Sequence, residues 1–233
     1  MLSILRNQQL IISDTTLFML PLQPDSSYHI FNHANGFEDL FRCEGNYWFF
    51  LQKYQLYIEP IAETYAYCLM PNHFHLVIRI RKREVIEGLV ANNFPKVSNF
   101  GKVIGDREIE KYLSKQFANL FSCYTQSFNK VYNRMGSLFI KNFKRELIED
   151  KKYFLTTVAY VHRNPIHHGF CRTYEEWPYS SYRQITEGIK SDLRTESEKL
   201  MKMTLGLDEF IKLHRQSLRI ILDDIIADDS TTA

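Results

Sequence analysis

The sequence contains few cysteines and no long hydrophobic run. Its four cysteines are scattered, with no Cys-x-x-Cys pair among Cys43, Cys68, Cys123 and Cys171. This spacing argues against a disulfide framework or a zinc ribbon and is typical of buried or free thiols in a reducing cytoplasm. No segment approaches the roughly 20 apolar residues that cross a bilayer, so we expect no membrane partner. The apolar run at residues 17–20 is too short for a signal peptide.

The sequence also has little net charge, but its basic residues are unevenly distributed. A formal net charge of +2 is weak evidence for a nucleic-acid partner. Within residues 128–145, however, basic and aromatic side chains alternate. Basic groups could neutralise phosphates while aromatic rings stack on unpaired bases. A solvated basic face over core aromatics is the other interpretation, and the sequence leaves both open. The residues concerned are Phe128, Lys130, Tyr132, Arg134, Phe139, Lys141, Phe143, Lys144 and Arg145.

Two histidines flank a phenylalanine at the start of an apolar run. His73-Phe74-His75 follows Pro71-Asn72 and precedes three apolar residues, which predicts a strand over residues 73–80 that is entered from a turn. Residues i and i+2 of a strand point to the same face, so the two imidazoles should project together. Two neutral imidazoles side by side suit a divalent metal. The alternative is a pair of buried polar groups with other partners in a core strand.

A second motif places Tyr160 four residues before Asn164, which is followed by Pro165. Apolar spacing upstream predicts a helix with Asp150 as its N-cap, ending before Pro165 because the residue before a proline avoids the α region. Tyr160 and Asn164 would then share one face near the helix end. A phenol can act as a nucleophile, and an amide oxygen can bind a metal. Alternatively, Tyr160 packs in the core and Asn164 caps the helix.

The order of predicted elements is that of an α+β protein. Strands are predicted at 28–34, 62–69, 73–80 and 143–149, and helices at 44–57, 84–92, 106–132, 151–164, 191–202 and 207–226. This βαββαβ-like order suits a ferredoxin-like antiparallel sheet with helices on one face. We divide the chain into an N-terminal extension (1–26), a central domain (27–185) and a C-terminal helical extension (186–233). The C-terminal helices would dock on the domain or support a homodimer.

The motifs occur in the order found in one protein family. From about residue 28 to about residue 182, the chain resembles the single-tyrosine HUH transposases, and among them the REP-associated tyrosine transposases. The matching segments are an opening strand and turn (28–36), the metal motif (70–75), a basic central segment (127–144), the nucleophile helix with its exit turn (160–169) and a carboxy-terminal signature (177–182).

The resemblance implies a DNA transposase that cuts and rejoins hairpin-containing single-stranded DNA in the cytoplasm, in association with the nucleoid. Tyr160 would attack the phosphorus, forming a covalent 5′-phosphotyrosine and freeing a 3′-hydroxyl. His73, His75 and Asn164 would bind Mg²⁺ or Mn²⁺; imidazoles suit Mn²⁺ better, and the identity of the metal stays open. The expected DNA contacts are Arg79, Lys130, Arg134, Lys141, Lys144, Arg145 and Arg163.

Some features leave other interpretations open. Tyr112 and Gln116 repeat the tyrosine-amide spacing and compete for the role of nucleophile, although the residues after Tyr160 fit the family pattern better. His33 stands where relatives often carry arginine, and His168 lies in the exit turn. Other functions are also open: a catalytically inactive or domesticated hairpin-binding module of the same fold, or an unrelated phosphoesterase that uses water.

Overall fold

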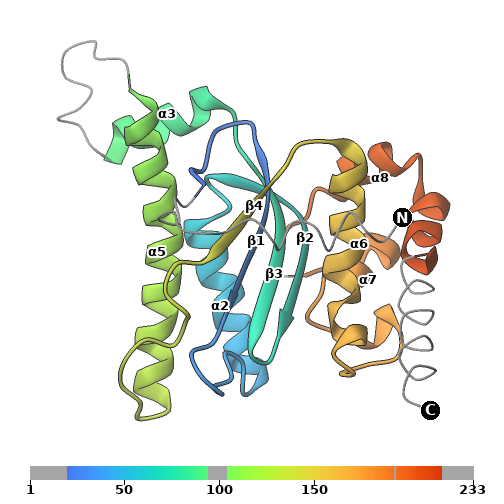
Figure 1. Cartoon of the computed structure of the whole chain (residues 1–233), viewed down its shortest axis with the longest axis horizontal. Helices are drawn as coiled ribbons and strands as arrows, with labels where there is room; N and C mark the ends of the chain where they lie inside the picture. Colours follow the sequence, from blue (N-terminus) through green and yellow to red (C-terminus); the bar gives the residue numbers. More distant parts are fainter. Residues whose placement is uncertain (1–19, 94–103, 192, 217–233) are drawn as a thin grey trace, which may run out of the picture.

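A four-stranded antiparallel sheet with the strand order β2-β3-β1-β4 lies at the centre of the molecule (Figure 1). The computed structural model describes residues 20–93, 104–191 and 193–216. The strands are β1 (Ser27–His33), β2 (Ala62–Met70), β3 (His73–Ile80) and β4 (Lys144–Ile148). The helices are α2 (Glu44–Tyr57), α3 (Arg83–Asn93), α5 (Asp106–Val131), α6 (Lys151–His167), α7 (Tyr182–Glu187) and α8 (Ser197–Thr204), with a 3₁₀ turn η1 (Tyr174–Glu176).

Helices cover both faces of the sheet (Figure 1). The first core lies between the sheet and α2 and α5, and it contains Phe74 and Leu76 of β3. The second core lies between the opposite face and α6, and it contains Val77 of β3 and Cys68 of β2. The predicted α+β class is confirmed, but the expectation of helices on one face is corrected. Because apolar side chains alternate onto both faces of these strands, each face needs a covering layer.

Helix α6 continues through Pro165 instead of stopping before it, which corrects the predicted end. A proline near the end of a helix removes only one backbone donor, and the turn beyond it closes normally. Phe170 N–H donates to Pro165 O at 2.8 Å and Gly169 N–H donates to Ile166 O at 3.0 Å. With Gly169 at φ +72°, this is a Schellman motif, in which the left-handed residue ends the helix.

The C-terminal segment packs on the central domain. Helix α8 begins at Ser197, later than predicted, and residues 207–216 form a further helix. Leu200 and Phe210 are fully buried in the second core. Residues 1–19, 94–103 and 217–233 lie outside the described residues, so the predictions that fall there stay predictions, as do the domain boundaries and the homodimer. None of the helices described is both long and apolar enough to span a membrane.

A buried hydrogen-bond chain fixes α6 to its neighbours. The carbonyl of Phe210 accepts from His214 Nδ1 at 2.8 Å, so His214 Nε2 must accept from His162 Nδ1 at 2.9 Å. His162 Nε2 then accepts from the Ser181 hydroxyl at 2.7 Å, whose oxygen accepts from Tyr67 N–H at 2.9 Å. Burial lowers the pKa of both imidazoles, to about 4 for His214, which keeps them neutral as this chain requires.

Replacing the central hydroxyl should destabilise the fold. Ser181→Ala removes two buried hydrogen bonds, one to the His162 ring and one from the Tyr67 amide, so we expect the free energy of unfolding to fall by about 2–4 kcal/mol. Urea denaturation measures the loss. The control is Ser122→Ala on the exposed face of α5, which should change stability by less than about 0.5 kcal/mol. Equal effects of the two substitutions would contradict the assigned chain.

Candidate nucleophile and metal site

The pairing of β1 with β3 brings four histidines together on the second-core face of the sheet. His33 lies opposite His73, and Phe31 lies opposite His75. The His33 and His73 rings stack with centroids 4.5 Å apart, while His73 and His75 meet at right angles with centroids 5.3 Å apart. His75 also stacks on His29 at 5.1 Å. The predicted histidine pair therefore projects as expected, into a larger aromatic cluster.

His73 and His75 are almost fully buried, at 3% and 5% exposure. Burial is the main reason that the pKa of His73 falls to about 3 and that of His75 falls well below its ordinary value. Both rings are therefore neutral, which is the form that binds metals. The amide oxygen of Asn72 lies 2.6 Å from His73 Nδ1. Since that oxygen can only accept, His73 Nδ1 carries the proton and Nε2 carries the lone pair.

Tyr160 of α6 lies beside this pair. Its ring meets His75 edge-on at 5.6 Å and His29 at 5.8 Å, measured between centroids. The side chain remains 38% exposed, so a large substrate can reach it. Burial raises the pKa of the phenol, while the amide of Asn164 and the guanidinium of Arg163 act in the opposite direction. Arg163 Cζ lies 5.7 Å from the centre of the Tyr160 ring.

Asn164 is buried and uses its amide nitrogen within the helix. Nδ2 donates to the backbone carbonyl of Tyr160 at 2.8 Å, so the amide oxygen is the atom of ligand type. Asn164 therefore does not cap the helix, whose end lies further on at His168. Among the described residues, no group of three or more His, Cys, Asp or Glu side chains could enclose a metal ion. The residues that would hold a metal here are His73, His75 and Asn164, which offer imidazole nitrogens and an amide oxygen.

The competing tyrosine lies on the other side of the sheet. Tyr112 belongs to the first core under α5 and is 6% exposed. Burial raises its pKa. The structure thus brings Tyr160, and not Tyr112, into contact with the predicted histidine pair.

The predicted DNA contacts separate into two groups. Lys144 lies opposite Phe31, which lies opposite His75, so all three share the histidine face, and Lys144 is exposed. Arg79 alternates onto the same face of β3, and Arg163 lies beside Tyr160. All three basic residues lie on the same side of the sheet as the candidate site, but Arg79 lies four residues beyond His75 along β3, where it pairs with Asp25 at 3.9 Å.

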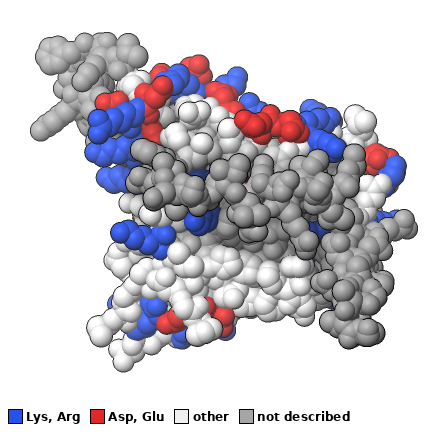
Figure 2. All heavy atoms as spheres, viewed as in Figure 1, with Lys and Arg blue, Asp and Glu red and all other residues white. Residues whose placement is uncertain are grey.

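The remaining predicted contacts lie elsewhere. Arg134 binds Glu38 at 2.8 Å and the carbonyl of Ser137 at 2.9 Å, which holds the loop after α5. Lys130 is exposed at the end of α5. In the view of Figure 2, blue and red side chains are mixed along the upper rim of the molecule. Charge alone therefore does not outline a DNA path along that rim.

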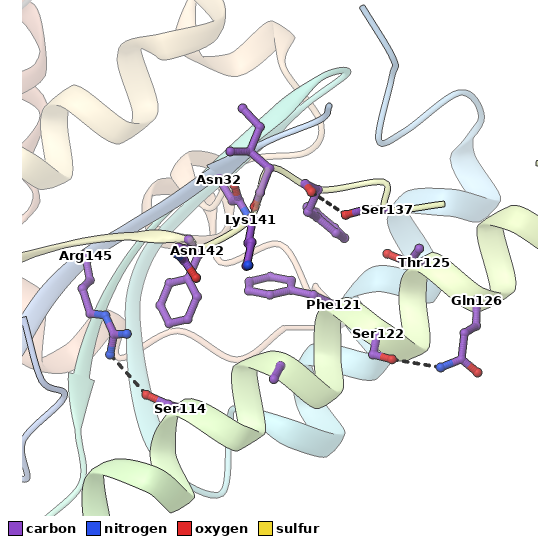
Figure 3. A pocket seen from close by; sticks show the side chains of 14 residues that line it. Asn32, Ser114, Phe121, Ser122, Thr125, Gln126, Ser137, Lys141, Asn142 and Arg145 are labelled. Carbon is purple, nitrogen blue, oxygen red and sulfur yellow. Dashed lines mark hydrogen bonds between the residues drawn. The ribbon is translucent and has the colours of Figure 1, made fainter. Parts of the chain in front are cut away.

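Arg145 and Lys141 lie at a cavity of about 510 Å³ beside α5, on the first-core side (Figure 3). Arg145 is buried, with Nη1 donating to the Ser114 hydroxyl at 3.3 Å and its guanidinium 4.7 Å from the Phe143 ring centre. Phe143 and Phe139 are themselves 8% and 4% exposed. For these two rings, the structure favours the interpretation as core aromatics over base stacking.

The sequence analysis missed two residues of the site. His29 of β1 lies directly opposite Glu146 of β4, and Glu146 Oε2 lies 3.2 Å from His29 Nδ1. The sequence did contain a signal, since His29 and His33 are four residues apart in one strand and their side chains therefore project to the same face. Its use required the strand register, which the sequence does not reveal. His168, interpreted as a turn residue, has its ring 4.9 Å from His73.

Comparisons with known proteins agree on one group. A protein of Haemophilus influenzae (strain Rd) with the provisional name REP-associated tyrosine transposase is 26% identical over 136 residues, which cover 58% of this chain and 65% of that protein. The match thus spans a little under two thirds of the relative. No family model matches the chain.

Among solved structures, a REP-associated tyrosine transposase bound to a REP hairpin has the same fold, with a TM-score of 0.51 and 13% identity. The superposition covers 80% of this chain and 93% of that one. Because the identity to this solved structure is low, the match is evidence for the fold alone. The Haemophilus influenzae protein provides the evidence from sequence. The chain is therefore similar in sequence to one REP-associated tyrosine transposase and similar in fold to another.

Proposed function

We propose that this protein is a transposase that nicks and rejoins hairpin-containing single-stranded DNA through a covalent bond to Tyr160. The observation that carries the proposal is an accessible tyrosine placed edge-on against His75, next to the buried and neutral His73. A core tyrosine would be covered, and two structural histidines would have no need of an exposed phenol beside them. The relation to REP-associated tyrosine transposases, one of which has been solved with a REP hairpin, supports the choice of DNA.

The proposed reaction transfers a phosphoryl group of the DNA to Tyr160 and back. The Tyr160 oxygen attacks a backbone phosphorus, the bond from that phosphorus to the 3′ oxygen breaks, and a 5′-phosphotyrosine forms. The phenolic proton is lost and the departing 3′ oxygen gains one, so a free 3′-hydroxyl results. A second 3′-hydroxyl can attack the phosphotyrosine and restore the phenol. Arg163 favours the phenolate electrostatically, against the effect of burial.

The donor atoms fit a divalent cation of borderline softness. His73 presents a neutral ring with its lone pair on Nε2, His75 lies beside it, and Asn164 supplies an amide oxygen. Such a set suits Mn²⁺ better than Mg²⁺. When bound, the metal would polarise the scissile phosphate and stabilise its developing charge. Lys144, on the same face of the sheet, would contact a backbone phosphate of the bound DNA, and Arg79 would contact one further along β3.

Removal of one hydroxyl should abolish cleavage and leave binding intact. With a labelled single-stranded hairpin oligonucleotide and Mn²⁺, we expect Tyr160→Phe to lower the cleavage rate by at least about a thousandfold. Hairpin affinity should stay within a few-fold, because only one atom is lost. The wild type should form a protein–DNA adduct that survives SDS, and Tyr160→Phe should not.

Tyr112→Phe is the matched control, because it removes the same atom from the competing tyrosine in the first core. It should cleave like the wild type. Cleavage by Tyr160→Phe with loss in Tyr112→Phe would transfer the role to Tyr112. Hydrolysis that survives both substitutions would favour a phosphoesterase that uses water, and binding without cleavage by the wild type would favour an inactive hairpin-binding module.

Metal dependence should be linked to the histidine pair. We expect EDTA to stop cleavage by the wild type, and His73→Ala to stop it at any Mn²⁺ concentration that saturates the wild type. His167→Ala changes an exposed histidine whose ring contacts His168, and it should cleave normally. A His73→Ala protein that cleaves at the wild-type rate in EDTA would refute the metal assignment.

A further inference from the structure

His29 connects a carboxylate to one of the histidines of the site. It lies in the middle of β1, directly opposite Glu146 of β4 and diagonal to His75 of β3. Its Nδ1 lies 3.2 Å from Glu146 Oε2 and its Nε2 lies 2.9 Å from His75 Nδ1. At 5% exposure, His29 is nearly closed to water, so these two contacts account for both of its ring nitrogens. The three side chains form one line across three adjacent strands.

The direction of the protons follows from the chemistry of the end group. An ionised carboxylate only accepts hydrogen bonds, so His29 Nδ1 carries a proton toward Glu146. In a neutral imidazole the other nitrogen is an acceptor, so His29 Nε2 accepts from His75 Nδ1–H. His75 then carries its lone pair on Nε2. This is the same tautomer that Asn72 imposes on His73, so both rings offer the same atom.

We propose that Glu146 and His29 are positioning residues for the metal: they hold His75 in the Nδ1–H tautomer and fix its ring so that Nε2 can bind the cation. This inference rests on the proposed function, since it assigns the support of the same site. Hydrogen-bonded carboxylates and imidazoles behind a metal-binding histidine fix its orientation and raise its basicity, and their loss commonly lowers metal affinity 10- to 100-fold.

The arrangement also affects the nucleophile. The Tyr160 ring meets both His29 and His75 edge-on, at 5.8 and 5.6 Å. A rotation of His75 about its own axis would therefore alter the contact with Tyr160 as well as the direction of the lone pair. One carboxylate on the edge strand thus acts on both the ligand and the tyrosine through a single buried ring.

The tautomer can be observed directly in the metal-free protein. Long-range ¹H–¹⁵N NMR of full-length protein with ¹⁵N-labelled histidine distinguishes a protonated from an unprotonated ring nitrogen, and His75→Gln assigns the signals. We expect His75 to show a protonated Nδ1 and an unprotonated Nε2. A protonated Nε2 on His75, as an imidazolium at His29 would require, overturns the proposal.

Calorimetric titration with MnCl₂ tests the consequence for binding. We expect Glu146→Ala to weaken Mn²⁺ binding about tenfold and His29→Phe, which keeps a ring of similar size, to weaken it at least as much. Glu146→Gln retains an acceptor oxygen and should recover part of the loss. The matched control is Glu149→Ala, which removes the same charge just beyond β4 and should bind like the wild type. Because Glu146 is half exposed, its replacement should leave the fold intact.

The outcomes separate this inference from the proposed function. If the wild type binds Mn²⁺ and cleaves, but Glu146→Ala and His29→Phe bind it as tightly as Glu149→Ala does, the positioning role is refuted and the proposed function stands. If the wild type does not bind Mn²⁺ and cleaves equally well in EDTA, the proposed metal site is refuted, and the role of Glu146 and His29 with it.

Discussion

The antiparallel register between β1 and β3 is the constraint on which the site depends. It places His33 opposite His73 and Phe31 opposite His75, and it brings His29 within hydrogen-bond distance of His75. A shift of one residue would turn the side chains of β1 to the other face. The histidines would then face α2 and α5, where the first core leaves no place for them. The burial of Tyr28 and Ile30 in that core stabilises the register.

Helix α6, which covers the second core, carries the proposed nucleophile, Tyr160, and is fixed by several contacts. Helix α6 carries Tyr160 on its exposed side, while His162 faces inward and joins Ser181 and His214 in a closed hydrogen-bond chain. This chain, the second core and the Schellman motif at Gly169 fix the helix along its length. The tyrosine is thus set by a rigid support on one side and remains open to a substrate on the other.

The sequence predicted much of this arrangement, and its failures have physical causes. Alternation in the strand gave the shared direction of His73 and His75, and the helical spacing gave the shared face of Tyr160 and Asn164. Local sequence patterns do not determine which strands pair or in which register. For this reason the sequence did not predict that α6 covers the second face of the sheet, nor the contacts of His29 and Glu146. The predicted end of α6 at Pro165 was wrong because a proline near the end of a helix destabilises it little when Gly169 closes the turn.

The central proposal is that His73 and His75 bind a divalent metal through their Nε2 atoms beside Tyr160. Anomalous diffraction at the manganese edge, from crystals of the full chain grown with MnCl₂, measures this directly. The account predicts one manganese peak within bonding distance of both Nε2 atoms, close to Asn164. A peak bound through Nδ1 of either histidine, or a manganese ion held by other residues while this pair is empty, would contradict it.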